Sequence, residues 1–151
     1  MIQEVFSLKP FDECENIEEL TQIVKIHRLM VEGLMRIIAA NIQHYGQQHD
    51  WTKTEYIEDF WKDVQERKEN PDFKEREWFK IHTTKEKHHL NMNVSDDATI
   101  LDLLEFISDC IITAKSTGQE INYDLMKLSD SDLKLLYENT IQWLDNITEV
   151  V

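Results

Sequence analysis

The sequence has 151 residues, with 16 Lys and Arg against 30 Asp and Glu and a formal net charge of −14 at pH 7. This length predicts a single domain over residues 1–151, and 41% hydrophobic residues are enough for a core. Only 3 Gly and 2 Pro are present. Because β-rich folds need many tight turns, we expect an all-α protein, a compact bundle of five to seven helices. The negative charge argues against non-specific binding of duplex DNA, which is itself a polyanion.

Three further features bear on location. No apolar run approaches the roughly 20 residues that a membrane-spanning helix needs, so we expect no membrane association. The acidic first 20 residues lack the apolar stretch of a signal peptide. Cys14 and Cys110 stand far apart and in no CxxC arrangement, which favours a reducing compartment. The sequence therefore predicts a cytoplasmic protein.

The first predicted helix is the longest. Residues 1–15 are expected to form an irregular arm, and Asn16 with Glu19 is typical of a helix start. From there, apolar residues recur at helical spacing to about Tyr45. This stripe consists of Leu20, Ile23, Val24, His27, Met30, Val31, Leu34, Ile37 and Ile38. It predicts an amphipathic helix that carries His27 on its buried face.

Shorter helices are expected next. A polar link over residues 46–52 precedes a second helix, which Thr52 and Glu55 are predicted to cap and which ends before Pro71. A third helix is predicted to start at Asp72. The polar residues from His82 to Met92 that follow it predict a loop with a helical turn.

Two helices complete the prediction. The fourth is expected to open near Ser95 and to end at Gly118, and the last begins at Ser129 or Ser131. The last helix has an apolar stripe that either closes the core or forms a homodimer. The predicted organisation is thus an arm (1–15), a core that carries the functional site (16–118) and a C-terminal helical closure (119–151).

Histidines and carboxylates carry the chemical signal. His27 lies on the apolar stripe, His49 stands directly before Asp50 in the polar link, and Asp109 lies within an apolar helical stretch. A bare buried carboxylate is costly, so Asp109 must be ligated, paired or turned to a cavity. Two imidazoles and two carboxylates form a mixed donor set that suits Mn²⁺, Fe²⁺, Co²⁺, Ni²⁺, Mg²⁺ or Zn²⁺.

The order His27, His49-Asp50, Asp109 resembles the HD-domain phosphohydrolase superfamily of all-helical, metal-dependent hydrolases. The sequence His-Asp-Trp-Thr-Lys resembles the HDxxK form of that family, with Lys53 in the place of the lysine. The resemblance covers about residues 20–115. With Trp78, His82 and the pair His88-His89, the pattern is similar to a small group of HD-like proteins frequent in phages and bacteria.

This resemblance implies a metal site and an activity. His27, His49, Asp50 and Asp109 would bind one divalent metal ion, and the histidines His82, His88 and His89 would bind a second ion or contact phosphate. The implied activity is hydrolysis of a small phosphorylated substrate, a nucleotide or related phosphate ester, by metal-activated water. Catalytic roles would fall to Asp50 or Glu55, orienting the water, and to Arg28 and Lys53, balancing charge on the phosphoryl oxygens. For a phage-encoded protein the location would be the host cytoplasm.

Other interpretations stay open. His27 could be a hydrogen-bonded core residue, His49-Asp50 a simple helix entry, and Asp109 the partner of a Lys or Arg. A second class of function is a non-catalytic, acidic interaction or inhibitor protein on an HD-like scaffold. A third is a haemerythrin-like di-iron bundle, in which His82 and either His88 or His89 would be ligands on bundle helices.

Overall fold

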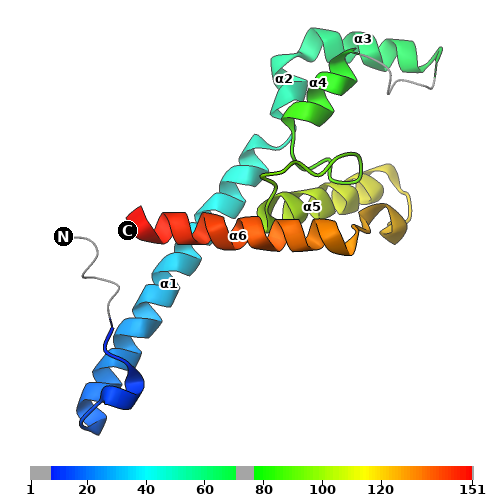
Figure 1. The fold of residues 1–151 in the computed structure, drawn as a ribbon. Coiled ribbons are helices and arrows are strands. Elements are labelled where there is room, and N and C mark those ends of the chain that lie inside the picture. Colours follow the sequence, from blue (N-terminus) through cyan, green and yellow to red (C-terminus); the bar gives the residue numbers. More distant parts are fainter. Residues whose placement is uncertain (1–7, 71–76, 151) are drawn as a thin grey trace. The chain divides into compact units, whose positions relative to one another are not determined.

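The computed structural model describes residues 8–70 and 77–150. Within these ranges the chain is helical, without strands, and the all-α prediction is confirmed (Figure 1). The elements in order are η1 (Phe11–Glu13), α1 (Ile17–Gln48), α2 (Trp51–Glu55), α3 (Ile57–Arg67), α4 (Glu77–Lys85), α5 (Ile100–Thr117), η3 (Tyr123–Met126) and α6 (Asp130–Val150). None of the helices in the described ranges combines the length and apolar character needed to cross a bilayer.

The contacts of the chain divide it into two compact units. The first unit comprises residues 1–43 and 141–151, and the second comprises residues 44–140. Both α1 and α6 contribute residues to each unit. All the candidate site residues except His27 and Arg28 belong to the second unit.

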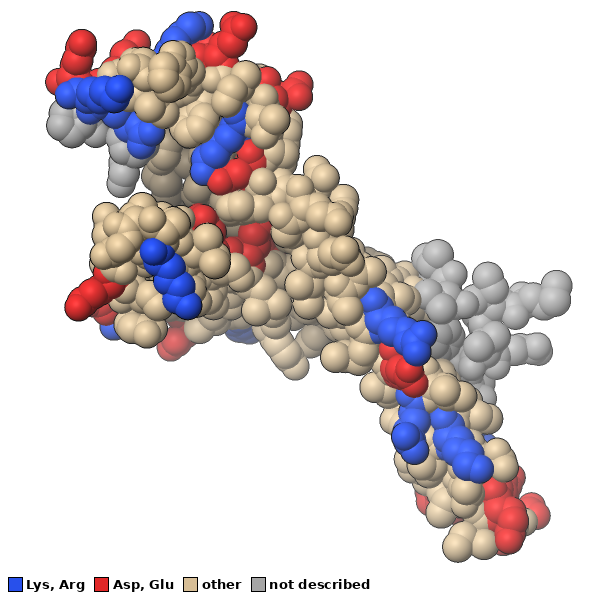
Figure 2. All heavy atoms as spheres, turned by 180° about the vertical axis from the view of Figure 1, so that it is seen from behind, with Lys and Arg blue, Asp and Glu red and all other residues tan. Residues whose placement is uncertain are grey.

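The first unit is built mainly from α1. Its predicted start is confirmed, because the Glu19 backbone N–H donates to Asn16 Oδ1 over 2.9 Å. The burial predicted for its apolar stripe is wrong: Ile23 is the one buried residue described in this unit, and His27 is exposed. A single long helix with an arm and the end of α6 has too few other residues to cover such a stripe. Figure 2 shows the long helix with acidic and basic side chains scattered among uncharged ones.

The second unit has an apolar core between α5, α6 and the loop that precedes α5. Leu90, Ala98, Phe106 and Leu136 form this core, and Ala98 and Leu136 are fully inaccessible to solvent. The predicted start of α6 is confirmed, because Ser129 Oγ accepts from a backbone N–H of its first turn. This core holds α5 in place beside the candidate site.

The start of α5 differs from the prediction. The helix begins at Ile100, because Thr99 is its cap and Asp102 accepts from the Thr99 backbone N–H over 2.7 Å. The predicted start at Ser95 is therefore five residues too early. The predicted end is confirmed, because Gly118 adopts the left-handed conformation, with φ 69°, that closes helices.

The region of α2 to α4 also departs from the prediction. The expected second helix is divided at Tyr56 into α2 and α3, and α3 packs on α4 with the Phe60 ring stacked on Trp78 at 4.5 Å. The predicted start at Asp72 lies outside the described residues. Because α4 continues to Lys85, His82 lies on its last turn, and the predicted loop follows that turn.

Candidate metal centre

His49 and Asp50 form the turn between α1 and α2. Asp50 has φ 58° and is the one non-glycine residue with positive φ among those described. Aspartate tolerates this left-handed conformation better than most residues. The turn brings the two neighbouring side chains together, with His49 Nε2 3.3 Å from Asp50 Oδ2.

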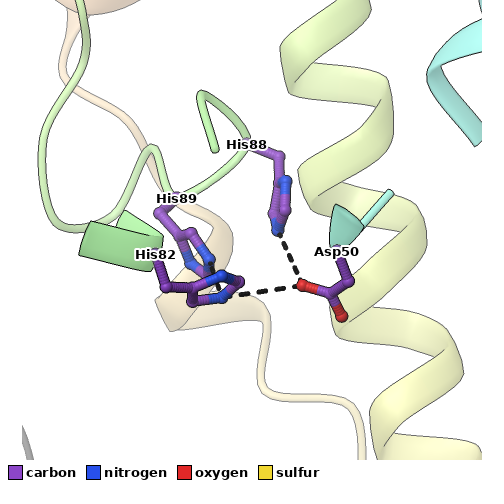
Figure 3. Close-up of side chains that lie close together, drawn as sticks. All are labelled: Asp50, His82, His88 and His89. Carbon is purple, nitrogen blue, oxygen red and sulfur yellow. Dashed lines mark hydrogen bonds and ion pairs between the residues drawn. The ribbon is translucent and has the colours of Figure 1, made fainter. Parts of the chain in front are cut away.

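Three histidines from α4 and the loop after it face the other oxygen of this carboxylate. Asp50 Oδ1 lies 3.6 Å from His82 Nε2 and 3.8 Å from His88 Nε2. His89 Nε2 in turn lies 2.7 Å from His82 Nε2. Figure 3 shows the three imidazoles and the carboxylate pointing toward one another. Asp50, His82, His88 and His89 are therefore a group that could hold a metal ion.

The spacing and the burial of these atoms fit a ligand set. A tetrahedral site with metal–nitrogen bonds of 2.0–2.1 Å places neighbouring ligand atoms about 3.3 Å apart, and the three contacts above span 2.7 to 3.8 Å. Asp50 Oδ1 and both ring nitrogens of His88 are buried without a hydrogen-bond partner. Each such orphaned polar group costs about 1–3 kcal/mol, which ligation would offset.

Thr52 sets the orientation of His82. This threonine is fully buried, and both its backbone N–H and its hydroxyl donate to Glu86 Oε1, over 2.9 and 2.8 Å. A hydroxyl has one hydrogen, so in the 2.6 Å contact between Thr52 Oγ1 and His82 Nδ1 the imidazole must donate. His82 Nε2 then carries a lone pair, which is the form of the ring nitrogen that can bind a metal.

The pKa values of two of these histidines are lowered. Burial lowers the pKa of His82 to about 4 and that of His89 to about 3. Both imidazoles are thus neutral at pH 7. A neutral imidazole is the form that binds a metal.

His49 lies in a second cluster formed with α5. Its Nδ1 is 2.9 Å from Glu105 Oε1 and its Nε2 is 3.5 Å from Asp109 Oδ1. Hydrogen bonds to Asp109, Asp50 and Glu105 raise the pKa of His49 to about 11. The His88 Nδ1 atom also lies 3.0 Å from Glu105 Oε1, without the alignment of a hydrogen bond. His49, His88 and Asp109 are a second group that could hold a metal ion, and Glu86, His88 and Glu105 are a third.

Lys53 belongs to the same site. Its ammonium group forms an ion pair and hydrogen bond with Asp50 Oδ2. Burial acts to raise the pKa of the Asp50 carboxyl, but His49 and Lys53 outweigh it and hold that pKa well below its usual range. Asp50 is therefore ionised throughout the physiological range.

The structure thus brings together most, but not all, of the residues predicted from the sequence. His49, Asp50, Lys53, His82, His88, His89 and Asp109 lie in one cluster of the second unit. His27 and Arg28 lie in the first unit and are exposed. The His27 ring contacts Phe11 edge-on, and His27 belongs to none of the metal-capable groups of the described residues. Glu55 is exposed on α2 and also lies outside those groups.

Three residues of the cluster were not predicted from the sequence to belong to the site: Thr52, Glu86 and Glu105. Glu105 precedes Asp109 by four residues, which places both on one helix face, and this spacing could have identified it. Glu86 stands between two lysines and resembles an ordinary charged surface segment. Thr52 was predicted to cap a helix with Glu55, whereas its N–H and hydroxyl bind Glu86.

Comparisons with known proteins do not identify the site. The chain matches no protein-family model, and neither the curated proteins nor the solved structures gave a match.

Proposed function

We propose that the protein is a metal-dependent phosphohydrolase that acts on a nucleotide or a related phosphate ester. The observation that carries this proposal is the convergence of Asp50 Oδ1 with the Nε2 atoms of His82, His88 and His89, of which Asp50 Oδ1 and His88 Nε2 are buried and have no hydrogen-bond partner. A set of three imidazoles and one carboxylate suits Zn²⁺, Fe²⁺, Co²⁺ or Mn²⁺. The four-residue group shares only Asp50 with the one implied by the HD resemblance, because His82, His88 and His89 take the place of His27, His49 and Asp109.

The surrounding residues support hydrolysis. A divalent ion supplies Lewis-acid polarisation of a phosphoryl oxygen and a lower pKa for the attacking water. In hydrolysis the water oxygen bonds to phosphorus, the P–O ester bond breaks, one proton leaves the water and one joins the leaving oxygen. His49, protonated and held by Glu105 and Asp109, is placed to donate the proton that joins the leaving oxygen. Lys53, on Asp50, adds a positive charge near the phosphoryl oxygens.

The two other classes of function fit these observations less well. In a haemerythrin-like bundle the histidine ligands project from bundle helices, whereas His88 and His89 lie in the loop after α4. An interaction protein that acts through surface carboxylates has no need of unpaired ligand atoms in its interior.

Metal content tests the proposal. The purified protein, His88→Ala, Asp50→Asn and the control His27→Ala would be compared by elemental analysis without added metal. We expect about one transition-metal ion per chain in the parent and in His27→Ala, and loss of the ion in the other two. Circular dichroism of each variant separates loss of metal from loss of fold. Metal-loaded parent protein would then be assayed against nucleoside monophosphates and an activated phosphodiester.

Three results would count against the proposal. A folded parent protein that stays empty after exposure to Mn²⁺, Fe²⁺ and Zn²⁺ would exclude it. Two irons per chain with an iron–oxo absorption band would favour the di-iron class. Loss of metal in His27→Ala with retention in His88→Ala would return the ligand set to the one implied by the HD resemblance.

A further inference from the structure

A cleft of about 190 Å³ lies beside the candidate metal centre, within the second unit. Its walls come from the end of α1, the start of α2, the end of α4 with the following residues, and α5. Glu86 and Glu105 line this cleft, and both also belong to a metal-capable group with His88. A molecule in the cleft is therefore a direct neighbour of the metal centre.

One wall of the cleft is a partly exposed aromatic ring, with the ammonium of Lys85 over it. Trp51 lines the cleft and is 38% exposed, although it directly follows Asp50 of the metal centre. The Lys85 ammonium lies 5.5 Å from the Trp51 ring centroid and donates to the Tyr56 hydroxyl over 2.6 Å. This lysine thus contacts both ends of α2. A fixed, solvent-accessible indole is a stacking surface for a flat ring.

The remaining walls are rich in hydrogen-bond acceptors. Glu86 and Glu105 present carboxylates, and Gln48 adds a side-chain amide. Carboxylates repel a phosphate group but accept hydrogen bonds from N–H and O–H donors. Lys85 and Lys87 are the cations that line the cleft, and Lys87 is paired with Asp97 at 2.5 Å. The walls thus favour an uncharged ring with polar hydrogens over a free anion.

The volume points to the same class of ligand. A water molecule occupies about 30 Å³ in the liquid, so the cleft holds the equivalent of about six waters. That is enough for a single ring system and too little for a folded nucleic acid or a peptide helix.

We propose that this cleft binds the base of a nucleoside monophosphate, with the ring stacked on Trp51 and its amino or imino hydrogens donated to Glu105 or Gln48. The phosphate of the same molecule is then directed toward Asp50 and the histidines. This inference rests on the proposed phosphohydrolase function and names its substrate class. Trp51 is a specificity residue and takes no part in the chemistry.

Calorimetric binding to the Zn²⁺-loaded protein tests this assignment. The probes are AMP, CMP and GMP against ribose 5-phosphate and inorganic phosphate. We expect at least one nucleotide to bind roughly tenfold or more tightly than ribose 5-phosphate, because stacking contributes this much for one base. Trp51→Ala should remove the preference and leave metal content and phosphate binding unchanged. Trp51→Phe should retain it, and so should the control Trp61→Ala, which changes an exposed tryptophan of α3 outside the cleft.

Two results would overturn the assignment. The first is equal affinity of the parent protein for nucleotides and ribose 5-phosphate, and the second is a nucleotide preference that survives in Trp51→Ala. A different result would contradict the proposed function, namely a protein that binds no metal. In that case adenosine and cytidine are compared with ribose in the presence of chelator, where preference for the nucleosides and its loss in Trp51→Ala still decide whether the cleft binds a base.

Discussion

The two units of the molecule bury different kinds of side chain. In the first unit α1 exposes large apolar residues, with Leu29 at 67% and Met35 at 58% exposure. In the second unit polar and charged side chains are buried beside the apolar core. These are Thr52, Asp63, His82, Glu86, His88, Thr99 and Asp102. The second unit also exposes large apolar residues, such as Ile112 at 65%, so among the described residues its buried polar side chains are what distinguishes it from the first.

The difference shows where the chain carries functional chemistry. An exposed apolar side chain forgoes stabilisation of about 25 cal/mol for each Å² left in water, but it leaves no polar group unsatisfied. A buried polar side chain without a partner is actively destabilising. His88 is 1% exposed, its Nε2 atom has no hydrogen-bond partner, and its Nδ1 atom has only the ion-pair contact with Glu105, so the second unit buries a polar group whose hydrogen bonding is incomplete.

The largest expected effect comes from metal binding. At about 1,000 times its dissociation constant, a metal ion should stabilise the second unit by about 4 kcal/mol. Amides of α5 and of residues 82–90 should then exchange hydrogen more slowly by roughly a thousandfold, whereas those of residues 17–43 should not respond. Hydrogen exchange with and without Zn²⁺ measures both. Equal protection of the two regions would show that the ion does not bind in the second unit alone.

A matched pair of leucine substitutions compares the two units without any ligand. Leu136 is fully buried in the second unit and Leu29 is exposed in the first. Leu136→Ala should lower the free energy of unfolding by about 2–5 kcal/mol, because it opens a cavity. Leu29→Ala should change it by less than about 0.5 kcal/mol. Urea denaturation of both variants measures this, and a comparable loss in Leu29→Ala would mean that α1 is covered in solution.

The hydrogen bonds of Thr52 offer a smaller and more specific test. Thr52→Val keeps the shape of the side chain and removes the hydroxyl, so Glu86 loses one donor and His82 loses its acceptor. We expect a loss of about 1–3 kcal/mol in stability and about 10–100-fold in metal affinity. Thr52→Ser should restore both. A purely structural role predicts that metal affinity, measured by competition with a chromogenic chelator, stays unchanged in Thr52→Val.

The last prediction is a pH dependence of the metal-free protein. The pKa of His82 is lowered on folding from about 6.5 to about 4. The unfolded chain therefore binds more protons between these values, so this residue contributes stability above about pH 6.5 that is lost as the pH falls through 4. His49 has the opposite sign: its contribution is complete below about pH 6.5 and is lost as the pH rises through about 11. Imidazole NMR titration in chelator should find His82 neutral at pH 6 and His49 protonated at pH 8.

Helix positions were largely predictable from the sequence, because periodicity and capping residues act over a few neighbours. Asn16, Ser129 and Gly118 mark helix ends where they were expected. Whether another element packs on a given helix face was not predictable. Periodicity shows that His27 shares a face with Val24 and Val31, but it does not show whether any other element packs on that face.

The composition of the cluster depends on contacts between distant residues. Thr52 and Glu86 are 34 positions apart and lie in hydrogen-bond contact only once α2 and α4 are packed together. The local alternative, a cap on Glu55, was equally reasonable from the sequence. His82, His88 and His89 were expected near the site, but their convergence on one oxygen of Asp50 depends on where α4 ends.

The left-handed backbone of Asp50 affects how substitutions at the site should be designed. An alanine at this position removes the carboxylate and, without the short polar side chain that lets aspartate adopt this conformation, pays the cost of about 1–2 kcal/mol that it has for most residues. An alanine scan would therefore mix the loss of a charge with a rearranged turn, and would displace His49 and Trp51 on either side. Asparagine tolerates this conformation and has nearly the same shape, so Asp50→Asn isolates the charge. Glycine would do the reverse, keeping the turn and deleting the side chain, and the pair together separates backbone geometry from electrostatics at one residue.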